Sequence, residues 1–445
     1  MEDGAAFQRH PPSSILYPRP LPHLPSPTIT MPRPPAEFVS RRAHGVDASG
    51  IRKVFDLAAK MKDPINFSIG LPDFDVPEEA KDAAIEAIRG GHNRYTPTQG
   101  IAPLRERLRK DLSAEMGRDV GDVLITSGVS GALLLAILAT IDPGDEAIFL
   151  DPYFVMYKHL LTMAGGIPVA VDSYPDFRFP AEKVEKAITP RTKLLILNSP
   201  SNPTGVVMTE PEVRAAVDVA NRHGLLIVSD EIYEPFLYGI EGSGFGVQGS
   251  GGEVVRVQGS GFRKEEIDAA SSSLNPEPRT LNPLLPSPAR HYPNTLILRG
   301  FSKSHAMTGW RLGCVAGPEA VVQQMAKLQQ YTFVCAPSPF QHAALKAMDL
   351  PMNAAVETYR RKRDRVVEGL SKKFEIVKPE GAFYIFPKAP AGITASDFVA
   401  RAIENNVLII PGNVFSERDT HFRISYATTD EKIAAGCEVL CSLVK

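Results

Sequence analysis

Residues 123–150 read VLITSGVSGALLLAILATIDPGDEAIFL. The apolar run VLIT leads through a Gly- and Ser-containing turn into a longer apolar stretch of helical length, and the second apolar run EAIFL follows after DPGD. Continuous apolar runs that alternate with helices are typical of parallel strands buried on both faces. The stretch therefore predicts one strand–helix–strand unit of a largely parallel α/β sheet.

The same alternation continues toward the C-terminus. Helical patterns begin near Phe154 and cover Glu210–His223, and five further apolar runs accompany them: IPVAV (167–171), LLIL (194–197), LLIVS (225–229), LILRG (296–300) and LGCVAG (312–317). Strands separated by amphipathic helices indicate an α/β fold with helices on the faces of the sheet. We predict a large domain of this kind over residues 78–330.

The pattern changes after residue 330. A long charged helix, two strand-like runs and a further helix are expected, followed by two more apolar runs and a final helix; the sequences are YRRKRDRVVEGLSKKF (359–374), EIV (375–377), AFYIF (382–386), DFVARAIENN (397–406), VLII (407–410) and FRISYA (422–427). This mixture predicts a smaller α+β domain over residues 331–445. Residues 37–77 are expected to join it.

Two segments differ in composition from the rest of the chain. Residues 1–36 contain PRPLPHLPSP (18–27) and few large apolar side chains, so they predict a disordered, proline-rich arm. Residues 242–290 open with GSGFGVQGSGGEVVRVQGSG and close with SSSLNPEPRTLNPLLPSPAR. Because such a segment buries too little apolar area to offset its ordering entropy, we predict a flexible surface insertion in the large domain.

Charge and cysteine content limit the possible partners and compartments. Forty-nine Lys and Arg against 51 Asp and Glu give a net charge of −2, which argues against a nucleic-acid partner, and no apolar run is long enough to span a membrane. Four scattered cysteines favour a reducing compartment, and we expect the cytoplasm, although the arginines of the arm leave organellar targeting open. Cys437 and Cys441 are interpreted as buried thiols, so no metal site is expected.

Polar residues follow four of the predicted strands. Residues 127–131 follow VLIT, residues 198–205 follow LLIL, residues 230–233 follow LLIVS, and residues 301–303 follow LILRG. Because ligands bind outside the carboxyl ends of strands in open α/β sheets, these four ends can build one site.

The residue types at these strand ends indicate a phosphorylated ligand. Residues 127–131 open a helix whose free N–H groups suit a phosphate, and Arg311 could fork onto the same oxygens. Lys303 is the candidate nucleophilic amine, and an amine beside a phosphate site suggests a Schiff base with a phosphorylated aldehyde. Asp230 could pair with a ring N–H⁺, as expected for pyridoxal phosphate.

Taken together, six motifs carry a resemblance to a known family. They are IGLPDFDVP (69–77), YTPTQG (95–100), SNPTG (201–205), SDEIY (229–233), FSKSHAMTGWRLG (301–313) and FRISYA (422–427). In this order they resemble the class I/II aminotransferases, aspartate aminotransferase-like members of the fold-type I pyridoxal-phosphate enzymes. The resemblance covers about residues 37–445 apart from the insertion. It implies that fold, pyridoxal 5'-phosphate as cofactor, and a homodimer.

The resemblance implies a role for each residue around the cofactor ring. Lys303 would form the internal aldimine and then move the proton of the substrate α-carbon. Asp230 would keep the ring nitrogen protonated, Asn202 and Tyr233 would bond the ring hydroxyl, and Phe154 would stack on the ring face.

The resemblance also implies how the phosphate is held. Tyr95 would reach the phosphate in the neighbouring subunit, which is the reason for expecting a homodimer. Within the same subunit the phosphate would be held by Val129, Ser130, Ser302 and Arg311. Many family members carry a Ser or Thr where this sequence has Gly300, so Ser302 has to supply that contact alone.

For the substrate, the resemblance implies that Arg423 clamps the α-carboxylate, helped by Gly70 and Asn202. One branch of the family that takes acidic substrates has a lysine at the position of Ser130. That lysine meets a distal carboxylate, and this sequence lacks it.

The resemblance therefore implies an aminotransferase that moves an amino group between an α-amino acid and a 2-oxo acid. A lyase of the cysteine-conjugate β-lyase type is the alternative enzyme, because both reactions begin with the same loss of the α-proton. A protein that holds the cofactor without catalysis is the third possibility. A DNA-binding domain would mark such a protein, and the 36-residue arm contains none.

Overall fold

The computed structural model describes residues 35–47, 50, 54, 59, 61–239, 246–248, 254–256 and 284–444. Contacts divide the chain into residues 1–44 and residues 45–445. In the first unit, η1 (Pro35–Phe38) and α1 (Arg41–His44) are the described elements. The predicted arm, residues 1–36, lies outside the described residues except at its last two positions.

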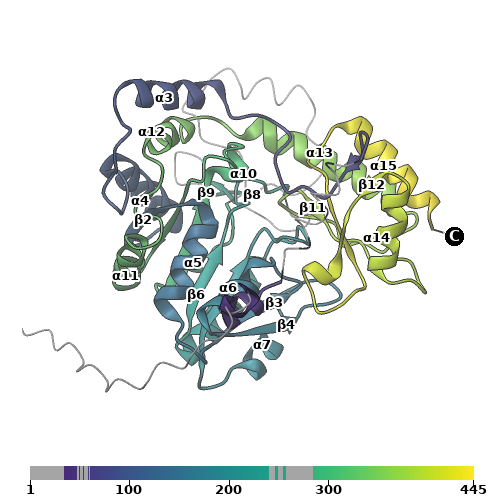
Figure 1. Ribbon diagram of the computed structural model, residues 1–445, viewed down its shortest axis with the longest axis horizontal. Coiled ribbons are helices and arrows are strands. Elements are labelled where there is room, and N and C mark those ends of the chain that lie inside the picture. Colours follow the sequence, from purple (N-terminus) through teal and green to yellow (C-terminus); the bar gives the residue numbers. More distant parts are fainter. Residues whose placement is uncertain are drawn as a thin grey trace, which may run out of the picture. The chain divides into compact units, whose positions relative to one another are not determined.

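A seven-stranded sheet forms the centre of the second unit (Figure 1). Its strand order is β2-β10-β9-β6-β5-β3-β4. All neighbours pair in parallel except β10, which is antiparallel to both β2 and β9. The strands are β2 (Asp122–Thr126), β3 (Glu146–Asp151), β4 (Ile167–Asp172), β5 (Thr192–Asn198), β6 (Leu226–Asp230), β9 (Thr295–Gly300) and β10 (Gly313–Gly317). The predicted mostly parallel α/β sheet is confirmed.

Both faces of this sheet are covered, because alternate side chains of each strand point to opposite sides. Leu194 and Ile196 of β5 pack in the cluster that contains α5, whereas Leu195 and Leu197 pack with α8. The helices that follow the strands are α5 (Gly128–Thr140), α6 (Met156–Ala164), α7 (Ala181–Ala187) and α8 (Glu210–His223).

Helix α8 shows how local sequence sets the ends of an element. Thr209 and Glu212 form a capping box at its start, and Gly224 ends it with φ of 66°. The bounds agree with the helix predicted over the same residues.

The outer edge of the sheet at β2 and β10 is covered by a separate apolar cluster. Leu104, Leu108 and Leu112 lie one turn apart on α4 and face Val123 and Ile125 of β2 in this cluster. The helices on this side are α3 (Glu78–Arg89), α4 (Ala102–Met116) and α12 (Ser338–Ala347), and the short α10 (Phe301–Ser304) follows β9. Helix α11 (Glu319–Gln329) packs in the other cluster, together with α5.

The C-terminal elements gather on one side of the second unit in Figure 1. They are α13 (Asn353–Leu370), β11 (Tyr384–Ile385), α14 (Ala395–Glu404), β12 (Val407–Leu408), β13 (Ile410–Pro411), η3 (Gly412–Val414), β14 (Phe422–Ser425) and α15 (Asp430–Ser442). Strands β11, β14 and β13 form an antiparallel sheet, and β1 (Ile65–Asn66) pairs in parallel with β12. The strand predicted at residues 375–377 is wrong, since those residues belong to no strand. The boundary at residue 330 stays a prediction.

The predicted insertion, residues 242–290, ends too late. Residues 284–290 are described and packed: Leu285 contacts the cluster of Val207 and Leu237, and the buried Ser287 hydroxyl donates to Glu231 Oε1 at 2.6 Å. The apolar and capping side chains of LLPSPAR explain the difference, because η2 (Pro288–Arg290) begins at the cap Ser287. Earlier in the segment, β7 (Gly246–Gln248) pairs with β8 (Val254–Arg256). The other residues up to 283 lie outside the described ones.

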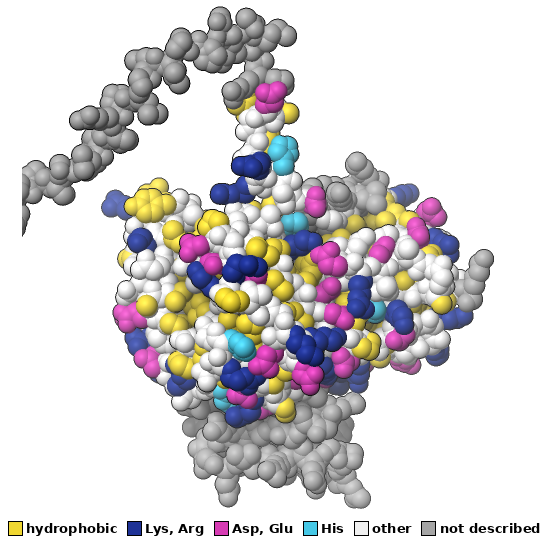
Figure 2. Space-filling model, turned by 90° about the horizontal axis from the view of Figure 1, so that it is seen from below, with side chains coloured by type: hydrophobic (Ala, Val, Ile, Leu, Met, Phe, Trp, Pro, Cys, Tyr) yellow, Lys and Arg dark blue, Asp and Glu magenta, His cyan; other side chains and the backbone are white. Residues whose placement is uncertain are grey.

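Basic and acidic side chains are intermixed over the face shown in Figure 2. Across the described ranges, no helix has both the length and the apolar character needed to cross a membrane.

Candidate active site

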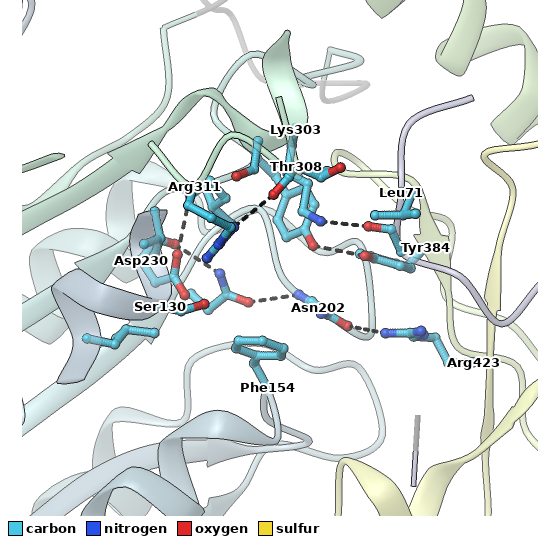
Figure 3. Close-up of a pocket in the computed structure, with 17 residues that line it drawn as sticks. Leu71, Ser130, Phe154, Asn202, Asp230, Lys303, Thr308, Arg311, Tyr384 and Arg423 are labelled. Atoms are coloured by element: carbon cyan, nitrogen blue, oxygen red, sulfur yellow. Dashed lines mark hydrogen bonds between the residues drawn. The ribbon is translucent and has the colours of Figure 1, made fainter. Parts of the chain in front are cut away.

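A cavity of about 330 Å³ lies where β2, β5, β6 and β9 end (Figure 3). Its size is that of a site for a small molecule. Eleven of the twelve predicted site residues line it: Gly70, Val129, Ser130, Phe154, Asn202, Asp230, Tyr233, Ser302, Lys303, Arg311 and Arg423. The twelfth, Tyr95, is 82% exposed and does not line the cavity.

Lys303 projects into the cavity from α10, directly after β9. Its Nζ donates a hydrogen bond to the carbonyl oxygen of Gly70 at 2.6 Å. Burial, together with the nearby Arg423 and Arg311, lowers the pKa of the Lys303 amine to about 8, and Asp230 opposes this shift. A sizeable fraction of this amine is therefore neutral near physiological pH, as a nucleophile or a base requires.

Asp230 ends β6 and is buried. Tyr157 Oη donates to its Oδ2 at 2.7 Å, and the backbone N–H of Ile232 donates to its Oδ1 at 3.3 Å. Burial raises the pKa of Asp230 to about 6 in spite of these hydrogen bonds. A buried carboxylate of this kind is suited to a cationic N–H group of a ligand.

A hydrogen-bonded row of side chains leads from Asp230 to Arg423. Asn198 Nδ2 donates to the carbonyl oxygen of Asp230 at 2.9 Å, and the N–H of Asn202 donates to Asn198 Oδ1 at 2.8 Å. Asn202 Oδ1 in turn accepts from Arg423 Nη1 at 3.0 Å. These bonds, drawn in Figure 3, hold the amide of Asn202 between the two charged residues.

Arg423 is 1% exposed, and its guanidinium lies 4.6 Å from the ring centres of both Tyr384 and Phe415. Nη2 donates to the carbonyl oxygen of Ser68 at 2.7 Å, whereas Nε has no partner. None of the ion pairs found in the described part of the chain involves Arg423. A buried guanidinium without a carboxylate is suited to an anionic ligand group.

A tight backbone arrangement forms the opposite end of the cavity. Gly128 has φ of +67°, and the backbone of Gly313 approaches so closely that a Cβ there would lie 2.8 Å from the carbonyl carbon of Gly128. The first turn of α5 therefore starts directly beside β10. Arg311 Nη1 donates to the carbonyl oxygen of Thr308 at 3.0 Å, close to this turn. The free N–H groups of the first turn, together with Arg311, can cradle a phosphate.

The family model for class I and II aminotransferases matches residues 62–440. The chain belongs to this family.

Similar proteins support the assignment to this family along nearly the whole chain. The enzyme named aromatic-amino-acid aminotransferase 2 of Thermococcus litoralis is 35% identical, covering 92% of this chain and 98% of its own. The aspartate aminotransferase of Geobacillus stearothermophilus is also 35% identical, covering 87% and 92%. Among solved structures, a single mutant of the Thermus thermophilus aspartate aminotransferase has a TM-score of 0.77 at 34% identity, covering 91% and 99%. This chain is therefore an aminotransferase, and its family depends on pyridoxal phosphate.

The structure of this aminotransferase adds residues that the sequence did not single out. Tyr157 bonds Asp230, and Tyr384 Oη lies 2.9 Å from Tyr233 Oη. Tyr384 belongs to the continuous apolar run AFYIF, which gives no indication of a hydroxyl partner. Leu71 and Thr308 also line the cavity. Within the described ranges, no three His, Cys, Asp or Glu side chains are grouped to hold a metal.

Proposed function

We propose that this aminotransferase holds pyridoxal phosphate in the cavity and moves an amino group between an α-amino acid and a 2-oxo acid, with Lys303 as the catalytic residue. The observation that carries the proposal is the buried Lys303 amine, whose pKa of about 8 leaves it partly neutral. It lines one cavity together with a phosphate cradle, a buried carboxylate and a buried guanidinium.

The residues present fit this cofactor. The close approach of Gly313 to Gly128 leaves no room for a Cβ, and the residues Val129, Ser130, Ser302 and Arg311, which line the cavity beside it, would supply donors to the phosphate. Asp230 would pair with the ring N–H⁺, Asn202 and Tyr233 would bond the ring hydroxyl, and Phe154 would cover the ring face. When bound, pyridoxal phosphate supplies an aldehyde for the amino group and a ring that delocalises the charge left at the α-carbon.

The protein's own residues would carry out three tasks. Arg423 would bind the substrate α-carboxylate through two parallel hydrogen bonds, with Asn202 and Gly70 beside it. This contact would place the α-carbon near Lys303. Lys303 would then take the proton from the α-carbon and deliver it to another atom of the reacting substrate and cofactor. Its lowered pKa allows both steps near neutral pH.

The test is the variant Lys303→Ala, with the exposed Lys327→Ala on α11 as the matched control. Amino transfer from a panel of L-amino acids to pyruvate should fall below about 1% of the parent rate in the first variant and stay unchanged in the second. Unaltered circular dichroism would show that both variants fold. More than about 1% residual transfer would contradict the role of Lys303.

The same assay separates transfer from the lyase reaction. A transaminase should form keto acid from an amino donor only when a 2-oxo acid acceptor is present. Keto acid and ammonia released over many turnovers without an acceptor would instead identify a lyase.

We also propose a homodimer in which Tyr95 reaches the site of the other subunit. Its 82% exposure and its position outside the cavity support this arrangement. Tyr95→Ala should be inactive by itself, because both of its sites lack the tyrosine. Mixing it in equal amounts with Lys303→Ala subunits would then create one complete site in each hybrid dimer. Activity should recover to about a quarter of the parent value. No recovery after subunit exchange would contradict the shared site.

For the compartment, we propose the cytoplasm. The four cysteines are free thiols in the structure, and burial raises the pKa of Cys314 to about 11. Free thiols fit a reducing environment. Mass spectrometry of the protein purified without reductant should find four unmodified thiols.

A further inference from the structure

Two buried phenols meet in the wall of the cavity. Tyr233 follows β6, and Tyr384 belongs to β11 of the C-terminal sheet. Their Oη atoms lie 2.9 Å apart, and both side chains line the cavity (Figure 3). The two phenols therefore connect the large sheet to the C-terminal sheet at the edge of the site.

The position of the Tyr384 hydroxyl is fixed by its surroundings. The backbone of Tyr384 pairs with Ser425 of β14, the strand that carries Arg423. The centre of its ring lies 4.6 Å from the Arg423 guanidinium carbon, and a Cβ at Gly70 would overlap with its Oη. Because the ring packs against Arg423 and the hydroxyl against Gly70, the hydroxyl stays beside Tyr233.

The protons of the two hydroxyls determine the direction of this hydrogen bond. Burial raises the pKa of Tyr233 well above its usual range, and it raises the pKa of Tyr384 in spite of Arg423. Both phenols are therefore neutral near pH 7, and each has one proton to donate. In the proposed function Tyr233 donates its proton to the ring hydroxyl of the cofactor. The Tyr233 oxygen can then only accept from Tyr384, which is the donor.

We infer that Tyr384 is a positioning residue of this aminotransferase, which donates to Tyr233 and so strengthens the hydrogen bond from Tyr233 to the ring oxygen of pyridoxal phosphate. The inference rests on the proposed function. A hydroxyl that accepts a hydrogen bond is polarised and becomes a stronger donor. In the attached cofactor the nitrogen of Lys303 shares its proton with the ring oxygen, which carries more charge once that proton leaves. A stronger donor to this oxygen therefore favours the deprotonated form and lowers the pKa of the nitrogen.

The first test measures the pKa of that nitrogen in the holoenzyme, from the absorbance of the bound cofactor as a function of pH. Tyr384→Phe keeps the ring and changes no charge, so Arg423 and Asp230, the charged groups that act on the two phenols, are retained. The variant should raise the pKa by at least about 0.3 units, roughly a twofold change in the proton equilibrium. Tyr233→Phe should raise it further. The double variant should equal Tyr233→Phe, because Tyr384 acts through Tyr233.

Tyr426→Phe is the matched control. The Tyr426 hydroxyl is buried and donates to the carbonyl oxygen of Ala382 at 3.2 Å, but the residue does not line the cavity. This variant should keep the parent pKa.

A parent pKa in Tyr384→Phe, together with a raised pKa in Tyr233→Phe, would overturn the inference and leave the proposed function intact. An effect of Tyr384→Phe that persists when Tyr233 is already Phe would do the same. An unchanged pKa in Tyr233→Phe would contradict the proposed contact of Tyr233 with the ring hydroxyl, and the inference with it.

The second test compares two ligands of the cofactor-free protein, pyridoxal phosphate and its analogue without the ring hydroxyl. Tyr384→Phe should bind pyridoxal phosphate at least about 2-fold more weakly than the parent does, because the hydrogen bond to the ring oxygen is weaker. It should bind the analogue as the parent does, and Tyr426→Phe should bind both ligands unchanged. An equal loss for both ligands in Tyr384→Phe would show that Tyr384 only supports the wall of the cavity, and would overturn the inference.

Discussion

Burial shifts the pKa values of Lys303 and Asp230 in opposite directions, because in each case it disfavours the charged form. The amine becomes easier to deprotonate, and the carboxylate becomes harder to ionise. Both shifts cost stability in the protein without its cofactor, and a ring N–H⁺ beside Asp230 would offset the second. The site therefore lowers the stability of the empty protein, and this trade between stability and function accompanies its fit to a charged ligand.

This trade can be measured with Asp230→Asn in the cofactor-free protein. The pKa of Asp230 is raised from 3.8 to about 6, so its contribution to folding is complete below pH 4 and is lost as the pH rises through about 6. At roughly 1.4 kcal/mol per pKa unit, the cost at pH 7.5 is about 3 kcal/mol. The neutral amide avoids this cost. Relative to the parent, the variant should gain free energy of unfolding between pH 4.5 and pH 7.5, while its affinity for pyridoxal phosphate falls.

Urea unfolding at the two pH values is the measurement, and Asp218→Asn on the exposed side of α8 is the control. The control should show the same difference from the parent at both pH values. If the free energy of unfolding of Asp230→Asn, relative to the parent, were lower at pH 7.5 than at pH 4.5, the ionised carboxylate would be stabilised by its surroundings.

Most of the residues that line the cavity could be predicted from sequence because Lys303, Asp230 and Asn202 lie at or shortly after the carboxyl ends of strands, and these ends converge. Tyr157 and Tyr384 could not be predicted in this way. Tyr157 reaches Asp230 from the first turn of α6, 73 residues away in sequence, and Tyr384 reaches Tyr233 across 151 residues. No local pattern carries such contacts, since they depend on how the elements pack.

At the scale of elements, β10 contacts the first turn of α5, where we propose that the phosphate binds. A methyl group on Gly313 would meet the backbone of Gly128 at 2.8 Å and of Val129 at 2.9 Å, and backbone cannot move aside without shifting the helix. Gly313→Ala should therefore weaken binding of pyridoxal phosphate by at least about 10-fold. Binding of pyridoxal, which lacks the phosphate, should change much less.

Gly309→Ala is the control for that prediction, because a Cβ at Gly309 would meet nothing within 4 Å. Its affinity for both ligands should equal that of the parent in a fluorescence titration. Equal losses for pyridoxal and pyridoxal phosphate in Gly313→Ala would show that the contact supports the fold rather than the phosphate.

Elements with strong local signals were predicted well. Helix α8 has a capping box and a terminal glycine, and it covers the predicted residues 210–223. The β strands of the large sheet are continuous apolar runs. The C-terminal sheet was harder, because β11 and β13 contain only two residues each and their pairing with β14 is set by distant contacts. The run at 375–377 has the composition of a strand but finds no partner strand.

At the scale of the whole molecule, the segment between Tyr238 and Leu284 lies between two stretches of sequence whose residues line the same cavity. Composition indicates that residues 242–283 add little apolar area, whereas residues 285–289 contribute buried side chains to the core. The sequence could not place this boundary, because LNPLLPSPAR is rich in proline like the residues before it, and only packing distinguishes Leu285 from its neighbours.

Two deletions test the boundary. Replacing residues 242–283 with a short Gly-Ser linker should leave amino transfer and thermal stability close to the parent values, since loop length alone changes stability by only about 1 kcal/mol. Extending the deletion through residue 290 removes Leu285, Ser287 and Ala289 from buried positions. It should lower the free energy of unfolding by several kcal/mol, on the order of 2–5. Equal stability of the two proteins in thermal melts would contradict the packed role of residues 284–290.

Reduction of the holoenzyme with borohydride, followed by peptide mass spectrometry, would show whether pyridoxal phosphate is held through Lys303 in this cavity. The reduced cofactor should be found once per chain, on the peptide that contains Lys303, and on no other lysine. Cofactor attached mainly to a different lysine, or a chain that takes up pyridoxal phosphate and yields no attached cofactor on reduction, would contradict the claim.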